Sequence, residues 1–501
     1  MKNNIFNLII IFIITLIGFF IFSHNIYFPL SDIGRELYIT EQISKGSVLY
    51  KDILIEFTPL GYLINGLILK IFGSSINTFL IIGLALSIIC LYGCYYITKF
   101  FTDKTISLFI TATIIPVCIF FPYISNWITP YSYSILYALA SFLWALYFLL
   151  ISVKTENKNY FILSCILLGF SIISKYEFFC FIFVLLFAAI YKKFKLKYLL
   201  WILLFPVISM IILFVQGCSI NDIYNTIKYI TALSKSHSLI NFYHYSGIFF
   251  NISKMQKNIN IFFNYNFVTF FFPMYFIILI IFISNIKYIK KNILLLILFL
   301  SAICSSIKTI GGISLEIYGT YFLPLLLICL ISFLYKHINK ILIIIFCIVI
   351  FISYSIYELT LYGIKEYKAP KNQTVRLFEE FYNPISETVE YINKNTNPDD
   401  TVLVIPEGTI INYFTNRKSH NSLFNLVPSN SEALTDSKII ELLENNPPNY
   451  IIISNLRYIC YKKGSFIKTW GKNIYEYIKQ HYILDETTGD EVMMYIYKKN
   501  D

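Results

Sequence analysis

Hydrophobic stretches long enough to cross a lipid bilayer recur along most of this chain, and they constrain its fold more than any other feature. A helix needs about 20 apolar residues to cross the hydrocarbon core. Within lipid, every backbone polar group must be satisfied inside its own segment, so helices are expected here. About 11 candidate spans result, at residues 5–23, 76–98, 105–122, 131–151, 160–173, 177–191, 198–216, 267–284, 292–307, 320–335 and 341–357.

The composition agrees with a polytopic α-helical membrane protein. Of the 501 residues, 57% are hydrophobic and only 14% are charged, whereas soluble domains carry about 25% charged residues. The mean hydropathy is +0.65. Ser23-His24-Asn25 after the first stretch is a poor cleavage site, so we expect a retained first span and not a cleaved signal peptide.

Lysines concentrate in short loops that alternate along the predicted spans. These loops contain Lys99 and Lys104, Lys154 and Lys158, Lys192 to Lys197, Lys287 to Lys291, and Lys336 and Lys340. The positive-inside rule places such loops in the cytoplasm. We therefore expect the N-terminus inside and, after an odd number of spans, the C-terminus outside. The same loops account for the net charge of +11, so no nucleic-acid partner is expected.

Residues 160–191 allow two interpretations, because Lys175 and Glu177 lie near their middle. A single span would bury both charges and reverse the charge pattern of every later loop. Two short helices that turn at the outer surface keep the pattern, so we expect two.

The chain divides into two parts. Residues 1–360 form the predicted transmembrane domain, with long outer loops at 24–75 and 217–266. Within the first loop, residues 59–72 are amphipathic and are expected to lie along the membrane interface. Residues 375–501 have a normal content of charged residues and predict an extracytoplasmic, soluble α/β domain. Its expected strands are 401–405, 450–453 and 491–497, and its expected helices are 385–393, 437–444 and 475–481.

The first outer loop carries acids and bases directly after the first span. Asp32 follows Pro29-Leu30-Ser31 and opens a predicted helix, where an N-cap role is the structural alternative to chemistry. Glu36 lies one turn later, and a surface pair with Arg35 or Lys45 is its structural alternative. Asp52 and Glu56 follow in the same loop.

No metal or cofactor site is indicated. His237 and His244 are seven residues apart, without a third ligand at a useful spacing. Most of the ten cysteines lie in apolar stretches and are expected to be buried hydrophobic residues. Cys218 and Cys460 lie in polar segments, where a disulfide is the minor alternative.

Four segments resemble the lipid-dependent glycosyltransferases of the C superfamily, including the protein O-mannosyltransferases and the aminoarabinose transferases of lipid A. The first combines Asp32 after the first span with the K-G-x-x-L-Y-x-D turn at 45–52. The others are G-F-S-I-I-S-K-Y-E at 169–177, Y-G-T-Y-F-L-P at 318–324, and the tail sequence D-D-T-V-L-V-I-P-E-G at 399–408. The mannosyltransferase pattern has adjacent Asp and Glu, whereas Ile33 follows Asp32 here.

The resemblance implies an inverting transfer from a polyprenyl-phosphate sugar to an acceptor hydroxyl at the outer membrane face. The acceptor is a lipid, a glycan or a protein of the cell envelope, and a divalent metal requirement stays open. Asp32 is the implied base, and Lys175 and Arg35 are the implied phosphate ligands. Pairing of Lys175 with Glu177 or snorkelling to the interface is the structural alternative. The supporting acids would be Glu36, Asp52 and Glu56, and the cavity residues Glu177, Glu316 and Tyr318.

Two other classes of membrane protein fit the same span pattern. A lipid or glycolipid transporter or flippase would show internal repeats and broken spans in matching halves, which this sequence does not show. An oligosaccharide ligase or polymerase shares long outer loops, but it does not require an Asp after the first span.

Overall fold

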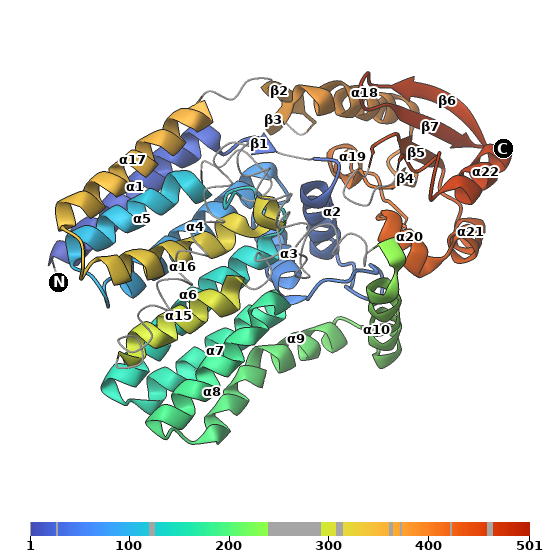
Figure 1. The fold of residues 1–501 in the computed structure, drawn as a ribbon. Coiled ribbons are helices and arrows are strands. Elements are labelled where there is room, and N and C mark those ends of the chain that lie inside the picture. Colours follow the sequence, from blue (N-terminus) through green and yellow to red (C-terminus); the bar gives the residue numbers. More distant parts are fainter. Residues whose placement is uncertain are drawn as a thin grey trace.

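A computed structural model describes the chain at residues 2–26, 29–119, 126–238, 292–306, 314–359, 364–370, 373–420, 423–457 and 464–500 (Figure 1). The predicted span 267–284 and much of the loop 217–266, with His244, lie outside the described residues. So does Cys460.

The first 359 residues are helical wherever they are described, apart from β1 (Asn25–Ile26) and connecting turns. The helices are α1 (Lys2–Phe22), α2 (Asp32–Ser44), α3 (Leu60–Phe72), α4 (Ile76–Thr98), α5 (Lys104–Cys118), α6 (Tyr133–Thr155), α7 (Lys158–Ser174), η1 (Tyr176–Cys180), α8 (Phe181–Lys192), η2 (Leu196–Leu203), α9 (Leu204–Val215), α10 (Ile220–Lys235), α15 (Ile293–Ser306), α16 (Ser314–Leu334) and α17 (Lys340–Leu359).

Several of these helices have the length and composition of membrane spans. Among the described residues, 4 helices are long and apolar enough to cross a membrane: Asn4–Ile21, Ile76–Thr98, Tyr133–Thr155 and Leu196–Val215. Other apolar helices are shorter, including α3, α5, α7 and α15. The mostly helical, apolar architecture is thus confirmed, while the number of spans and their orientation stay predictions.

The segment 160–191 contains two helices, as expected from its charges. Helix α7 ends at Ser174, and Lys175 has extended backbone angles (φ −157°, ψ 118°) that break the helix. The chain then turns through η1 into α8. Lys175 and Glu177 therefore lie at the turn between two helices.

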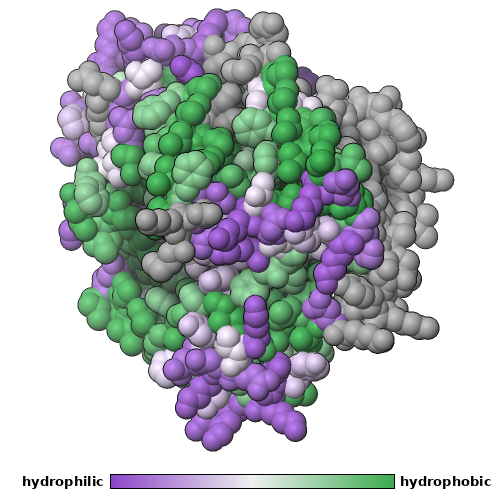
Figure 2. Space-filling view, turned by 90° about the vertical axis from the view of Figure 1, so that its left-hand side faces the viewer, coloured by the Kyte–Doolittle hydropathy of each residue, from purple (hydrophilic) through white to green (hydrophobic). Residues whose placement is uncertain are grey.

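Large hydrophobic side chains are exposed on the helical part, as expected of surfaces that face lipid. Examples are Phe6 and Phe20 on α1 and Ile341 and Val349 on α17. Figure 2 shows the side of the molecule where these helices lie, with broad hydrophobic areas divided by hydrophilic residues.

The tail forms an α/β region, as predicted. Its main sheet has the order β4-β5-β7-β6, with strands Val402–Ile405, Tyr450–Ser454, Met494–Lys499 and Tyr482–Thr488. β4 and β5 are parallel, and the other neighbours are antiparallel. The tail helices are α18 (Glu379–Asn395), α19 (Thr409–Thr415), α20 (Pro428–Leu434), α21 (Asp436–Asn445) and α22 (Lys472–His481).

A second sheet connects the tail to the end of α1. Strand β3 (Gln373–Phe378) pairs with β2 (Ile364–Ala369) on one side and with β1 on the other. The expected domain boundary at residue 375 falls inside β3. The sequence analysis did not predict β2, β3 or β6, because their polar residues hide the strand pattern.

Helix α2 also connects the helical part to the α/β region, because it packs on α19 (Figure 1). Gly34 permits this contact. A Cβ atom added there would lie 2.3 Å from the Pro29 carbonyl oxygen and 3.0 Å from Cβ of Ile410. Further along α2, the Ser419 N–H donates to the Tyr38 hydroxyl at 2.7 Å.

Candidate active site

Asp32 is the first residue of α2 and is paired with Arg35, one turn later. Ser31 occupies the N-cap position, so the prediction that Asp32 itself caps the helix is wrong. Instead Asp32 Oδ1 accepts a hydrogen bond from Arg35 Nη2. The i, i+3 spacing places both side chains on the same face. A carboxylate in the first turn is also favoured by the helix dipole.

Arg35 lies between two carboxylates from opposite ends of the sequence. Its Nη1 atom is 3.4 Å from Oε1 of Glu407, and the side chains of Arg35, Glu407 and Asp32 are 8%, 10% and 29% exposed. Burial alone would lower the pKa of the guanidinium, but the nearby carboxylates hold that pKa well above its usual value. Arg35 Nε has no hydrogen-bond partner among the described residues. The guanidinium therefore keeps N–H groups that a further anion could use.

Lys175 joins the same cluster through an aromatic ring. Arg35 Cζ lies 4.9 Å from the ring centroid of Phe57, and Lys175 Nζ lies 4.8 Å from it. The face of an aromatic ring attracts cations at such distances. The structure thus brings together Asp32, Arg35 and Lys175, three residues that the sequence analysis had selected. It also adds Phe57, which that analysis missed.

Lys175 and Glu177 form a buried ion pair. Their N–O distance is 3.8 Å, and the side chains are only 4% and 2% exposed. The pairing alternative is therefore confirmed, and the snorkelling alternative is wrong because Nζ does not extend into solvent. Lys175 also lies 5.3 Å from the ring centroid of Tyr131. A buried lysine whose ion pair with Glu177 is 3.8 Å long, and whose charge also lies near two aromatic rings, is suited to binding a further anion.

Glu36 has a different position from the one expected. The predicted surface pair with Arg35 or Lys45 is wrong, because Glu36 is only 1% exposed. Its carboxylate accepts hydrogen bonds from the Tyr62 hydroxyl and, at 3.2 Å, from the Tyr133 N–H. Burial raises the pKa of this carboxyl group, although the hydrogen bond from Tyr62 opposes the effect. Glu36 thus fixes α2 against α3 and the first residue of α6.

The remaining candidate residues divide between those that the structure places and those that it does not. Asp52 Oδ2 accepts the Val48 N–H at 2.7 Å and so stabilises its own turn. Glu56 precedes Phe57, and its negative charge contributes to the raised pKa of Arg35. Glu316 and Tyr318 belong to α16, but their side chains lie outside the described residues. In the described part of the chain, no group of three or more His, Cys, Asp or Glu could hold a metal ion.

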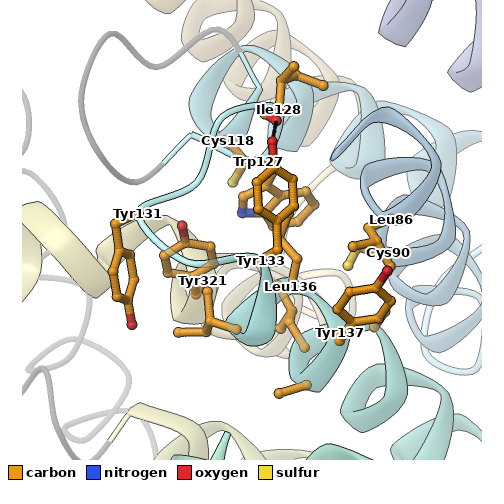
Figure 3. Close-up of a cluster of buried hydrophobic side chains, with 14 of the residues drawn as sticks. Leu86, Cys90, Cys118, Trp127, Ile128, Tyr131, Tyr133, Leu136, Tyr137 and Tyr321 are labelled. Carbon is orange, nitrogen blue, oxygen red and sulfur yellow. Dashed lines mark hydrogen bonds between the residues drawn. The ribbon is translucent and has the colours of Figure 1, made fainter. Parts of the chain in front are cut away.

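Figure 3 shows a cluster of buried hydrophobic side chains, among them Tyr131, which also contacts Lys175. Tyr131 and Tyr321 meet edge to face, with ring centroids 5.9 Å apart. The turn before α6 is held by Asn126, whose side-chain oxygen accepts the N–H groups of Ile128 and Thr129 at 2.9 and 2.6 Å. This turn positions Tyr131 against Lys175.

Glu407 is a second site residue, besides Phe57, that sequence reasoning missed. It follows β4 in Pro406-Glu407-Gly408, and it reaches α2 although 372 positions separate it from Arg35. A usable signal existed, because ligands of open α/β sheets bind outside the carboxyl ends of the strands, and Glu407 lies two residues after the end of β4. That signal says nothing about its partner.

Comparison with known proteins supports the same superfamily. Residues 57–215 match the family model of dolichyl-phosphate-mannose-protein mannosyltransferases. This range includes Phe57 and Lys175, whereas Asp32 and Arg35 precede it. No curated protein sequence is significantly similar to the chain.

Two solved structures share the fold over nearly the whole chain. ArnT from Cupriavidus metallidurans bound to undecaprenyl phosphate matches with a TM-score of 0.57 and 9% identity, covering 98% of this chain and 97% of ArnT. The oligosaccharyltransferase AglB from Archaeoglobus fulgidus, in complex with an inhibitory peptide and a dolichol-phosphate, matches with a TM-score of 0.50 and 12% identity. That match covers 99% of this chain and 74% of AglB. The family model thus supports the resemblance to lipid-dependent membrane glycosyltransferases of the C superfamily over residues 57–215, and the two solved structures show a shared fold.

Proposed function

We propose that this protein transfers a sugar from a polyprenyl-phosphate donor to an acceptor hydroxyl at the outer membrane face, with inversion at the sugar carbon. The observation that carries the proposal is the cluster of Asp32, Arg35 and Lys175. Two cations lie over one aromatic ring, and a partly exposed carboxylate lies beside one of them.

The cations match the chemistry of the leaving group. When the bond between the sugar C1 and the phosphate oxygen breaks, its electron pair stays on the phosphate. Negative charge that develops there is stabilised by fixed positive groups in a site of low polarity. Arg35 provides planar N–H groups suited to phosphate oxygens, and Lys175 provides a compact charge. Undecaprenyl phosphate bound to ArnT and dolichol-phosphate bound to AglB are ligands of this chemical class.

Asp32 matches the second requirement, a base for the acceptor. The acceptor oxygen attacks C1 on the face opposite the phosphate, and its proton passes to the Asp32 carboxylate. A single displacement of this kind inverts the configuration at C1. Asp32 is the more exposed of the two carboxylates that pair with Arg35, at 29% against 10% for Glu407, so it is the one that an acceptor can reach. Glu36 is too deeply buried for that role.

The test uses the full chain, purified and placed in lipid nanodiscs, with radiolabelled polyprenyl-phosphate sugars. We expect release of polyprenyl phosphate and transfer of label to an added acceptor mixture. A flippase would move the intact donor between leaflets of proteoliposomes without cleaving it, and a ligase or polymerase would consume only diphosphate-linked saccharides. Either outcome would refute the proposed transfer.

A further inference from the structure

We propose that Glu407 is a positioning residue that holds Arg35 in place for the donor phosphate, so that the α/β region completes the site. This inference rests on the proposed function, because it assigns a role in phosphate binding to Arg35. It gives the tail a part in the chemistry that its sequence alone does not indicate.

The charge balance around Arg35 supports this role of Glu407. A buried guanidinium is costly unless carboxylates compensate it, and Arg35 is held by Asp32 and Glu407. Asp32 must be able to turn toward the acceptor and take up its proton. During that step Glu407 would compensate the positive charge of Arg35 and hold its guanidinium in position for the donor phosphate. With Asp32 as the sole carboxylate on Arg35, base and phosphate ligand would depend on the same bond.

The backbone around Glu407 is held firmly between β4 and α19. It follows the buried strand β4, and the Leu426 N–H donates to the Pro406 carbonyl at 2.7 Å. Gly408 has a φ of +153°, which glycine adopts easily, and starts α19 directly afterwards. The carboxylate therefore lies on a short, well-held connection between a strand and a helix. Such a connection can hold a side chain in one position against Arg35.

The contact between α2 and α19 begins at Gly34, the residue next to Arg35. Gly34 lies close to Ile410 of α19, because a Cβ atom added there would lie 3.0 Å from Ile410 and 2.3 Å from the Pro29 carbonyl oxygen before α2. Tyr38 and Lys45 continue the contact on α2, with bonds from the Ser419 N–H and to the Asn416 side chain at 2.7 and 2.5 Å. Correct docking along α2 therefore sets the separation of Arg35 and Glu407.

A second contact between the two parts of the chain provides a matched control. Glu432 of α20 accepts the Ser238 N–H at 2.9 Å and a bond from the Ser238 hydroxyl. It is also a carboxylate that bridges the tail and the helical part, but it contacts neither Arg35 nor Lys175 in the described structure. Glu432→Gln therefore removes one carboxylate charge from a contact between the two parts of the chain that lies away from Arg35.

The experiment compares Glu407→Gln, Glu407→Asp, Arg35→Gln and Glu432→Gln in full-length protein in nanodiscs. Two properties are measured: the affinity for polyprenyl phosphate without sugar, and kcat and KM for the donor. We expect Glu407→Gln to weaken polyprenyl phosphate binding roughly 10-fold, the scale of one charge-assisted contact, and to raise KM more than it lowers kcat. Glu407→Asp should restore part of the affinity, and Glu432→Gln should match the unsubstituted protein.

Two failures can be told apart. Unchanged affinity and KM in folded Glu407→Gln, with weakened binding in Arg35→Gln, would overturn the positioning role alone. Unchanged affinity in Arg35→Gln would overturn the phosphate role of Arg35 in the proposed function. If Glu407→Gln does not fold, Gly34→Ala gives the same test without a change of charge. It should weaken phosphate binding because the added Cβ would collide with the Pro29 carbonyl oxygen and crowd Ile410, which shifts α2 against α19, and binding at full affinity would overturn the proposal.

Discussion

Replacing Asp32 by Asn separates catalysis from structure at the centre of the proposed site. The substitution keeps the size of the side chain but removes its ability to accept a proton. If Asp32 is the base, turnover should fall by roughly 10² to 10⁴. Binding of polyprenyl phosphate should change little, because Arg35 and Lys175 remain.

The structural cost of the same change is small. The Asp32 side chain is 29% exposed, and partly exposed ion pairs contribute about 1 kcal/mol or less to stability. Arg35 is not left uncompensated, since Glu407 lies 3.4 Å away. A structural role alone would thus alter the ratio of folded to unfolded protein by about fivefold at most, which leaves nearly all of the protein folded and cannot produce the loss of turnover expected for a base.

The assay is steady-state transfer from a labelled donor at varied donor concentration, with thermal unfolding measured in parallel. Glu407→Gln is the matched control, because it takes an equal charge from the same guanidinium without removing the proposed base. We expect a large fall in kcat for Asp32→Asn only, and mainly a rise in KM for Glu407→Gln. Near-normal turnover by folded Asp32→Asn would refute the assignment of the base and leave Asp32 as a partner of Arg35.

Three further predictions concern the phosphate ligand, the tail and the orientation. Lys175→Met should raise KM for the donor and lower kcat, and it should destabilise the fold by about 3–5 kcal/mol because Glu177 loses its ion-pair partner; Lys175→Met with Glu177→Gln should recover stability in thermal unfolding but not turnover. Burial lowers the pKa of His420 below 6.5, so the unfolded chain binds a proton first as the pH falls; stability of the α/β region should decline from pH 7.5 to pH 5, and His420→Gln should flatten that decline. A cysteine at exposed Ser437 should be labelled from outside intact cells and one at exposed Asn159 should not; reversed labelling would place Asp32 on the cytoplasmic side.

The helical part was predictable because each span records its own signal. Apolar stretches of suitable length gave α4, α6 and α17 within a few residues, since burial in lipid depends only on local composition. The break at Lys175 was also predictable, because two charges inside an apolar segment conflict with a continuous span. In the tail, the buried strands β4 and β5 were predicted for the same reason.

Features that depend on a distant partner were not predictable. Strand β3 alternates buried and exposed residues, but its neighbours are β2 and the two residues of β1 at the end of α1. Glu36 looked like a surface residue, because nothing local shows that Tyr62 and Tyr133 enclose it. Phe57 looked like one aromatic residue among many, in a sequence with 47 phenylalanines.

Three consecutive residues of α2 explain why so much of the site depends on this helix. Gly34 contacts α19 of the tail, Arg35 contacts Glu407 and Phe57, and Glu36 contacts Tyr62 and Tyr133. Successive helical residues point about 100° apart, so adjacent positions reach three different parts of the fold. A shift of any one part therefore moves Arg35. Because Glu407 of the tail positions Arg35 for the donor phosphate, docking of the tail and binding of the phosphate are linked through this single turn of helix. Each should therefore stabilise the other.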